Sequence, residues 1–501
     1  MSRFTDISPL VAGHEGFFSQ IANIGLDHKK RVDRYKSYWD FYEGKHWNVV
    51  DHDNVTTNYI RRLVNLKCDF LTKNSFYVSI PELPNSLDDS IDRNFIKNIL
   101  DDQWSLNEKD VWFRDLAQMG GVTGDAFVRV GWERSPSGGM FAMANIIPSH
   151  FVFPEFDVLH PKRMVTCHII WPSVTRSSRN NASTKRPWGG VGNDTVTWFR
   201  ETWTETEVVV LENDKILKRE PNVLGEIPVV HIKNVNNTNS YYGVSDVEDL
   251  ISVQMTYNET LTDINDIIEY HGSPITHVKG GRLEEVNKGP DQVWSTSKDV
   301  EIKNIGLDSD LKANISFLHE LYRAILDLSS VPEQAVNPTK NVSNTPGVAL
   351  HMAYLPLIEN RRKKILNYGQ GIKHINRLML KTLELGEPDF GSRMDQVKTY
   401  KYRTDLSFGE PLPRDEVQEL EKKRTLLNMG LTTRKRVLMR EGKSAEDSER
   451  IIEEADAELE RLTEIRLLKP MVQTRVSDAF GKARSPDPVI QGDKVSNQST
   501  F

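Results

Sequence analysis

Cysteine is scarce in this sequence: Cys68 and Cys167 are the only two among 501 residues. One disulfide is arithmetically possible, but a reducing compartment would keep both thiols free. Two cysteines and scattered histidines give no metal-ligand spacing. We therefore expect no bound metal and no cofactor.

Long apolar runs are also missing. None approaches the ~18 residues that a membrane-spanning helix needs. The first residues, MSRFTDISPL, lack the basic segment followed by an apolar stretch that marks a signal peptide. We expect a protein that works in the cytoplasm in which it is made and that has no membrane partner.

Positive charge is not in surplus, because 64 Lys and Arg are outnumbered by 71 Asp and Glu, giving a formal net charge of −7. A protein that grips DNA tightly usually shows an excess of cations. If this chain meets DNA, it should not hold the duplex by neutralising its phosphates wholesale.

What the sequence does contain is a succession of helix and strand patterns. The chain of 501 residues is too long to fold around one compact core, so we expect two to four structural regions. We expect the α+β class with mainly helical content. A turn is predicted at the glycines of 120–124, since the Lys-Ser/Thr of a phosphate-binding loop does not follow them. Strand patterns lie in AFVRVGWE and across 195–232, with a hairpin turn at 212–214. Apolar periodicity predicts early helices at 28–47, 58–73 and 104–119.

The most informative segment begins at Ser245, where Ser245-Asp246-Val247-Glu248 has the pattern of a capping box that opens a helix. The helix should extend to about Tyr270 and end at Gly272 and Pro274, a length of ~39 Å at 1.5 Å per residue. A packing seam with alternating three- and four-residue spacing and one polar member runs along it: Val247, Leu250, Gln254, Tyr257, Leu261, Ile264 and Ile268.

Acidic residues gather on the opposite face of this helix. No Lys or Arg occurs from 245 to 270, although exposed helix faces usually mix both signs. The residues alone leave two interpretations open: a solvated face, or a wall that meets a polyanion without binding it. The five acids are Glu248, Asp249, Glu259, Asp263 and Asp266.

A second long helix is predicted from about Leu311 to Ser330, where Pro332 follows. Short strands are expected between the two helices, near 275–279 and 300–305. The apolar stripe of the second helix consists of Leu311, Ile315, Leu318, Tyr322 and Ile325.

The rest of the chain is predicted to be loop and helix. Residues 337–345 combine a proline with three asparagines and should form a loop. The next helix should reach about Leu385, with a kink at Pro356 and an interruption around Gly369 and Gly371. Short helices divided at Gly430 and Gly442 should follow over 413–468, and the polar tail from about Pro470 is predicted to be disordered.

Enzyme motifs are incomplete. Gly442-Lys443-Ser444 resembles the end of a phosphate-binding loop, but the required first glycine would fall at Val437. The acidic residues around 246–249 and 263–266 could be imagined as ligands of a two-metal nuclease, but no His or Lys supports them. We expect no catalytic residue and neither ATPase nor nuclease activity.

Several separate patches resemble the portal proteins of tailed bacteriophages, specifically the long-chain type with an all-helical C-terminal crown. They follow the order of that family and cover roughly residues 30–460. The sequence departs from the family pattern at Pro346, where Ser is commoner, and at Leu431-Thr432-Thr433, where Leu/Ile-Ile-Ser is commoner. The patches include YWDFYEGKH at 38–46, GDAFV at 124–128, GEIPVV at 225–230, GVSDVE at 243–248 and GVAL at 347–350.

The resemblance implies a phage portal fold assembled as a ring, with twelve copies at one vertex of the capsid. In that ring the five acids would line the channel. A tunnel loop would reach the axis with Asn337, Lys340, Asn341 and Asn344. The implied regions are a wing at 1–240, a stem helix at 241–272, a clip at 273–310, a second stem helix at 311–336, the tunnel loop at 337–347, a kinked wing helix and return strand at 348–412, a crown at 413–470 and a tail at 471–501.

The resemblance also implies a function and partners. The ring would be a channel for double-stranded viral DNA during packaging by the terminase large subunit, head–tail joining through an adaptor, and ejection. Major capsid and scaffolding proteins would be further partners. Assembly would take place in the host cytoplasm and the product would reside in the virion. The alternative is another ring-forming head–tail connector or a scaffold protein.

Overall fold

The chain divides into two compact units, Met1–Pro411 and Leu412–Phe501. It combines helices with antiparallel sheets and is mostly helical, so the predicted α+β class is confirmed. The computed structural model describes residues 26–47, 54–81, 90–134, 140–160, 163–175, 195–272, 275–280, 301–305, 311–337, 351–386, 390–391, 394, 402–411, 416–440 and 448–462.

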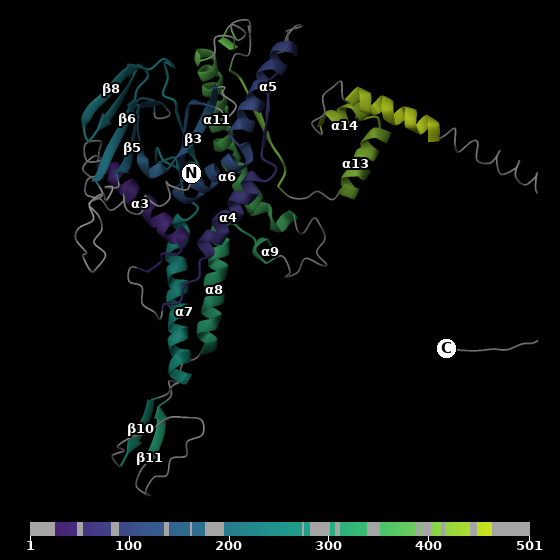
Figure 1. Ribbon diagram of the computed structural model, residues 1–501. Coiled ribbons are helices and arrows are strands. Elements are labelled where there is room, and N and C mark those ends of the chain that lie inside the picture. Colours follow the sequence, from purple (N-terminus) through teal and green to yellow (C-terminus); the bar gives the residue numbers. More distant parts are fainter. Residues whose placement is uncertain are drawn as a thin grey trace, which may run out of the picture. The chain divides into compact units, whose positions relative to one another are not determined.

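A five-stranded antiparallel sheet, ordered β4-β5-β6-β7-β8, forms one side of the first unit (Figure 1). The hairpin predicted at 212–214 is confirmed, because Asn213 and Asp214 take the left-handed φ values of 43° and 67° between β7 and β8. The strands are β4 (Val152–Phe156), β5 (Met164–Thr175), β6 (Thr195–Trp203), β7 (Glu207–Glu212) and β8 (Lys215–Pro221).

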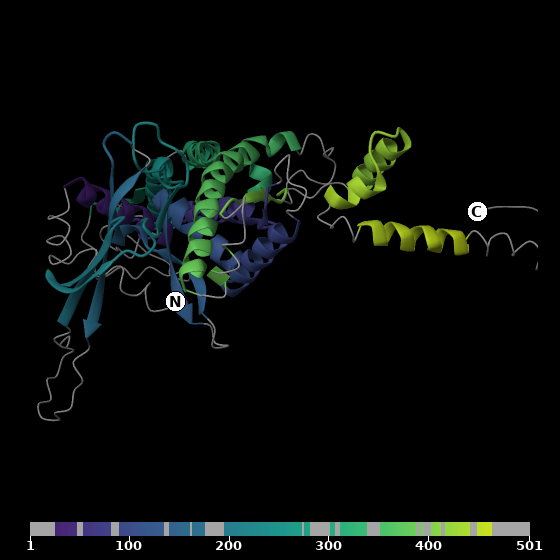
Figure 2. The same ribbon diagram turned by 90° about the horizontal axis from the view of Figure 1, so that it is seen from above.

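A three-stranded sheet, ordered β3-β2-β9, is covered by the long helix α11 (Figure 2). The short strands β1 (Phe76–Ser79) and β12 (Asp405–Phe408) pair antiparallel, in contact with α5 and α11, and bring together residues 326 positions apart in the chain. The sheet and the helices around it are β2 (Asp125–Arg134), β3 (Met140–Ile147), β9 (Val229–Lys233), α3 (Leu26–Glu43), α4 (Tyr59–Thr72), α5 (Ser90–Leu106), α6 (Lys109–Thr123) and α11 (Leu355–Gly386).

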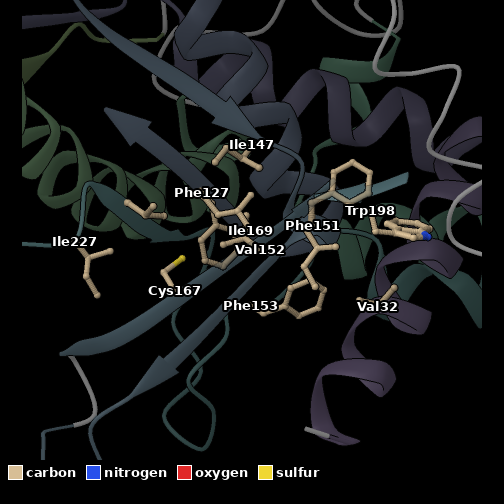
Figure 3. Packing of buried hydrophobic residues seen from close by; sticks show 12 residues of the cluster. Val32, Phe127, Ile147, Phe151, Val152, Phe153, Cys167, Ile169, Trp198 and Ile227 are labelled. Carbon is tan, nitrogen blue, oxygen red and sulfur yellow. The ribbon is translucent and has the colours of Figure 1, made fainter. Parts of the chain in front are cut away.

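An apolar core joins the two sheets and α3 around the short 3-10 helix η1 (Ser149–Phe151). Figure 3 shows the aromatic side chains of Phe127, Phe151 and Phe153 packed among aliphatic ones. Cys167 lies in this core as a free thiol. Burial raises its pKa and, in Cys68 on α4, lifts the thiol pKa to about 12, so both stay protonated.

The helix predicted at 104–119 is two helices, because α5 ends at Leu106 and α6 begins at Lys109. Glu108 between them has a left-handed φ of 51°. The Asn107 side chain explains the break. Its amide donates to the carbonyl of Ala142 at 2.9 Å and its oxygen accepts the N–H of Ala144 at 2.8 Å, which ties this point to the edge of β3.

The turn predicted at 120–124 is wrong except at its end, since α6 continues to Thr123 and stops at Gly124 with φ 84°. A Cβ on Gly120 would lie 2.1 Å from the hydroxyl oxygen of Tyr368 on α11. Glycine therefore serves here to bring α6 against α11 rather than to end the helix.

The interruption predicted at Gly369 and Gly371 is also wrong, because α11 runs unbroken from Leu355 to Gly386. A Cβ on Gly371 would lie 2.4 Å from the Cγ1 of Ile232 on β9, so this glycine lets the helix approach the sheet. The kink predicted at Pro356 is replaced by a turn at Tyr354, which leaves Pro356 in the first turn of α11, where its missing N–H is not needed.

Two antiparallel helices, α7 (Ile251–Gly272) and α8 (Leu311–Ser329), project from the body of the unit (Figure 1). Both were predicted, and so were the strands β10 (Ile275–Lys279) and β11 (Glu301–Ile305), which pair beyond their ends. The short helices η2 (Glu248–Leu250) and α9 (Glu333–Val336) lie at the body end of the pair.

A buried ion cluster, which we call the Asp246 junction, holds the start of this projection. The Asp246 carboxylate binds Lys67 of α4 at 3.1 Å and Lys364 of α11, and the three side chains are 2–6% exposed. Asn234, next to β9, donates to the same carboxylate at 3.3 Å, and the backbone N–H of Asp246 donates to Gly121 of α6 at 2.9 Å. Four elements of the body thus converge on the residue that precedes η2 and α7.

The C-terminal unit contains α13 (Glu416–Asn428), α14 (Arg434–Arg440) and a helix over 448–462. Gly430, with φ 68°, separates α13 from α14 as predicted. Gly442 and the tail beyond 470 lie outside the described residues, and so do the predictions made for them.

Replacing Asp246 with Asn should destabilise the first unit by about 3 to 5 kcal/mol at pH 7, because two buried lysines would lose their anion. Burial alone would raise the pKa of Asp246, but Lys364 and Lys67 lower it to about 2. The carboxylate therefore stabilises the fold fully above about pH 4, and this contribution is lost as the pH falls towards 2.

Urea unfolding of the wild type and the Asn variant across that pH range measures the effect. The stability difference should narrow below about pH 4. The matched control is Asp249→Asn, an exposed carboxylate three residues away, which should change stability by less than about 0.5 kcal/mol. A difference that stays constant from pH 7 to pH 2 would show that the ion cluster does not stabilise the fold.

Candidate functional site

Of the seven members of the predicted seam along α7, four are buried, and Tyr257 and Leu261 are half-buried. Val247, Leu250, Gln254 and Ile264 are each less than 9% exposed. Ile268 is wrong as a seam member, because its side chain is 57% exposed. At this end of α7, the described part of the chain places α8 beside the helix (Figure 1). On α8, Ile315 is likewise 47% exposed, although it was predicted to pack.

The predicted capping box at Ser245 is not formed. The Ser245 hydroxyl donates to the carbonyl of Val122 at 2.5 Å and accepts the N–H of Val247 at 3.0 Å. Val247, the residue before η2, caps it with no side-chain hydrogen bond. The serine therefore fastens the approach to α7 onto the end of α6, and a turn of 3-10 helix intervenes before α7 begins.

Two buried amides on successive turns of α7 hold the helix to segment 54–59; we call them, with their partners, the amide clasp. Gln254 accepts the N–H of Tyr59 at 3.1 Å and donates to the carbonyl of Thr57 at 3.0 Å. Asn258 accepts from both the N–H and the hydroxyl of Thr57, at 3.1 and 2.9 Å. Both amides have 0% exposure, so these bonds are made away from water.

A histidine completes the amide clasp. The Asn258 amide nitrogen donates to Nδ1 of His46 at 2.7 Å, and Nε2 of His46 lies 2.9 Å from the carbonyl of Phe41. Since the carbonyl can only accept, the proton sits on Nε2 and the ring is neutral. Burial lowers the pKa of His46 and favours this neutral form. The sequence pattern predicts Gln254 as the polar member of the seam but does not single out Asn258 or His46.

All five predicted acids are exposed. Three of them, Glu259, Asp263 and Asp266, fall within about 60° of one another around the α7 axis at 100° per residue, on the side away from the buried amides. We call these three the acidic face. Among the described residues, none of the three forms an ion pair with a Lys, Arg or His.

Glu248 and Asp249 differ from the acidic face, since they lie in η2 beside α3. Burial raises the pKa of Tyr38 on α3, and the nearby Glu248 carboxylate, which accepts a hydrogen bond from the Tyr38 hydroxyl, raises it further. The five acids are therefore divided: two approach the body of the unit and three follow the projecting helix.

The predicted tunnel loop is described only at Asn337. This residue ends α9, where its backbone N–H donates to Glu333 at 2.8 Å and its side-chain amide to the Tyr322 hydroxyl of α8 at 3.4 Å. Lys340, Asn341 and Asn344 lie outside the described residues.

Neither a metal cluster nor a membrane span is found in the part of the chain that the structure describes. Within it, no three His, Cys, Asp or Glu side chains gather as metal ligands would. No helix there is long and apolar enough to cross a bilayer. Lys443, the cation of the incomplete phosphate-loop motif, is among the residues not described.

Replacing Asn258 with Leu should loosen α7, because the N–H of Thr57 and Nδ1 of His46 would lose their partner in a buried site, at a cost of about 1 to 3 kcal/mol. Amide hydrogen exchange of residues 251–262 should accelerate correspondingly. Asn265→Leu, an exposed asparagine two turns further along α7, is the matched control and should leave exchange unchanged. Equal exchange in the two variants would show that the amide clasp does not hold the helix.

Comparisons with known proteins identify the family of this chain. The family model described as phage portal protein, SPP1 Gp6-like, matches residues 191–464, which are 274 of the 501 residues and include α7, α8 and all five acids. Among solved structures, a chain from the virion of a native gene transfer agent particle is similar at 12% identity and a TM-score of 0.42, over 75% of this chain and 88% of that one. No curated protein sequence matches. The family match spans more than half of the chain, and this chain belongs to the phage portal protein family.

Proposed function

We propose that this chain is the subunit of a ring that encloses double-stranded DNA at one vertex of a phage capsid. The DNA passes through the ring during packaging and ejection, and head–tail joining takes place on it. The observation that carries the proposal is the acidic face: three exposed carboxylates on a projecting helix that bears no Lys or Arg from 251 to 272.

Self-association is supported by a second apolar stripe on α8. Phe317, Leu321, Ala324 and Leu328 follow each other at four-, three- and four-residue spacing and lie on one side of the helix. Phe317 and Leu328 are each 50% exposed. A projecting pair of helices that leaves such a stripe in water is incomplete alone, and the same pair in a neighbouring copy would cover it.

Electrostatics favours a conduit over a clamp. Duplex DNA carries one phosphate charge per about 1.7 Å of its axis, and a basic wall would neutralise those charges, release counterions and retain the DNA. The acidic face does the opposite. Its repulsion is screened beyond about 8 Å at physiological salt, so it acts only near the wall and keeps the duplex centred while it slides.

The remaining roles follow from the same proposal. The β10–β11 hairpin at the far end of α7 and α8 would meet the terminase large subunit during packaging and the head–tail adaptor afterwards. The tunnel loop from 337 to 347 would approach the DNA with Lys340. Major capsid and scaffolding proteins would surround the ring, which would hold twelve copies and assemble in the host cytoplasm. The chain itself would catalyse no reaction, so ATP hydrolysis would belong to the terminase.

Replacing Asp263 and Asp266 together with Lys should leave rings intact and slow DNA packaging about tenfold at low salt, because the cations would retain phosphates. The slowing should ease as salt rises, since screening weakens the contact. Packaging by purified capsids, followed as nuclease-protected DNA over a series of salt concentrations, measures both effects.

Glu320→Lys with Asp327→Lys is the matched control. It makes the same change in charge on exposed positions of α8 and should package normally. Normal packaging by the α7 variant, or equal slowing by both variants at every salt concentration, would contradict the proposed channel wall.

A further inference from the structure

The described helices of the C-terminal unit share no buried apolar core. Among its described residues no apolar side chain is buried, and Ser448 alone reaches 0% exposure. Large apolar side chains stand in water instead: Leu420, Met429, Leu431, Leu459 and Leu462 are 59–68% exposed. Three short helices that bury so little apolar surface cannot be stable in isolation.

Helix 448–462 shows where cover is missing. At 100° per residue, Ser448, Ile451, Ile452, Ala455, Leu459 and Leu462 form one stripe. Ser448 is buried and the two isoleucines are half-buried, so the first turn of the stripe is covered within the unit. The last two turns are open, with Leu462 59% exposed.

The acidic residues of helix 448–462 indicate what kind of surface covers the exposed end of its apolar stripe. Helix 448–462 has six acidic residues and two arginines, and acids flank the stripe. Asp456 pairs with Arg434 at 2.6 Å and Glu449 with Lys435, but no ion pair is found among the described residues for Glu453, Glu454, Glu458 or Glu460. The occupant must therefore offer an apolar surface flanked by cations.

This chain itself carries such a surface. Met429 and Leu431, 66% and 68% exposed, stand at the turn between α13 and α14. α14 has four cations and no acid, and among them Arg436 is exposed and has no ion pair among the described residues. The open end of the 448–462 stripe and the Met429–Leu431 turn with α14 are two different surfaces of one chain. If each binds the other in the next copy, the contact is head-to-tail, and its repetition can close a ring.

We infer that the open end of the 448–462 stripe packs on the Met429–Leu431 turn and α14 of a neighbouring copy, so that the C-terminal unit is completed only by assembly. The inference rests on the proposed ring. It adds a second belt of contacts between copies, separate from α7 and α8. Contact is made by Leu462 against Leu431, and the carboxylate of Glu458, which flanks the stripe, faces Arg436.

Hydrogen exchange of the full-length protein tests the inference. Amides of 448–462 should exchange at least about tenfold more slowly in assembled rings than in dissociated subunits. Leu462→Glu should abolish that protection while native mass spectrometry still shows rings, because α7 and α8 lie outside this contact. Ala457→Glu, on the opposite side of the same helix, is the matched control and should keep the protection.

Exchanging the charges of Arg436 and Glu458 provides an independent test of the same contact. Arg436→Glu should reduce the protection, and adding Glu458→Arg should restore it, because every contact in the ring would then carry the exchanged pair. Rings whose 448–462 amides exchange as fast as in single subunits would overturn the inference and leave the proposed ring standing. Slow exchange of the 448–462 amides retained in Leu462→Glu rings would also overturn the inference and leave the proposed ring standing. A chain that stays monomeric would contradict the ring, and the inference with it.

Discussion

The position of the projecting helices depends on one buried carboxylate. Asp246 is 4% exposed at its side chain and is neutralised by Lys67 and Lys364, which come from helices almost 300 residues apart in the chain. Burying three charged groups is costly unless they are well paired. The two ion pairs therefore persist only while α4 and α11 keep their positions relative to Asp246. Because Asp246 lies two residues before η2, that constraint sets where α7 leaves the body.

Polar contacts extend this constraint along α7. Asp125 accepts the N–H of Gly243 at 2.8 Å and Ser245 bonds to the end of α6, so the approach to the helix is fastened before the Asp246 junction. The amide clasp at Gln254 and Asn258 then fixes the rotation of the helix about its axis, since both amides must face segment 54–59. That rotation turns the acidic face away from the body. The surface proposed to meet DNA is thus oriented by polar groups that never touch it.

Patterns with a local cause were predictable. The 3-4 spacing of apolar residues, with Gly272 and Pro332 as stops, located α8 within one residue and the end of α7 within two, although α7 begins six residues after the predicted Ser245. The absence of cations near 259–266 marked the acidic face. Features with a distant cause were not. Asn107 breaks a helix because it bonds to β3, and Gly371 leaves a helix intact because Ile232 packs on it. Ser245 does not form its predicted capping box because its hydroxyl bonds to Val122, 123 residues away. The Gln254–Asn258 spacing of four could have revealed the amide clasp, but its partner His46 lies 212 residues from Asn258.

The central claim is that these contacts place the acidic face on the wall of a ring. The most direct measurement is a cryo-electron microscopy map of the assembled full-length protein at a resolution that shows side chains. A closed ring with Glu259, Asp263 and Asp266 directed at the central axis is the expected result. A ring with these carboxylates on its outer surface, or an assembly without a central channel, would contradict it.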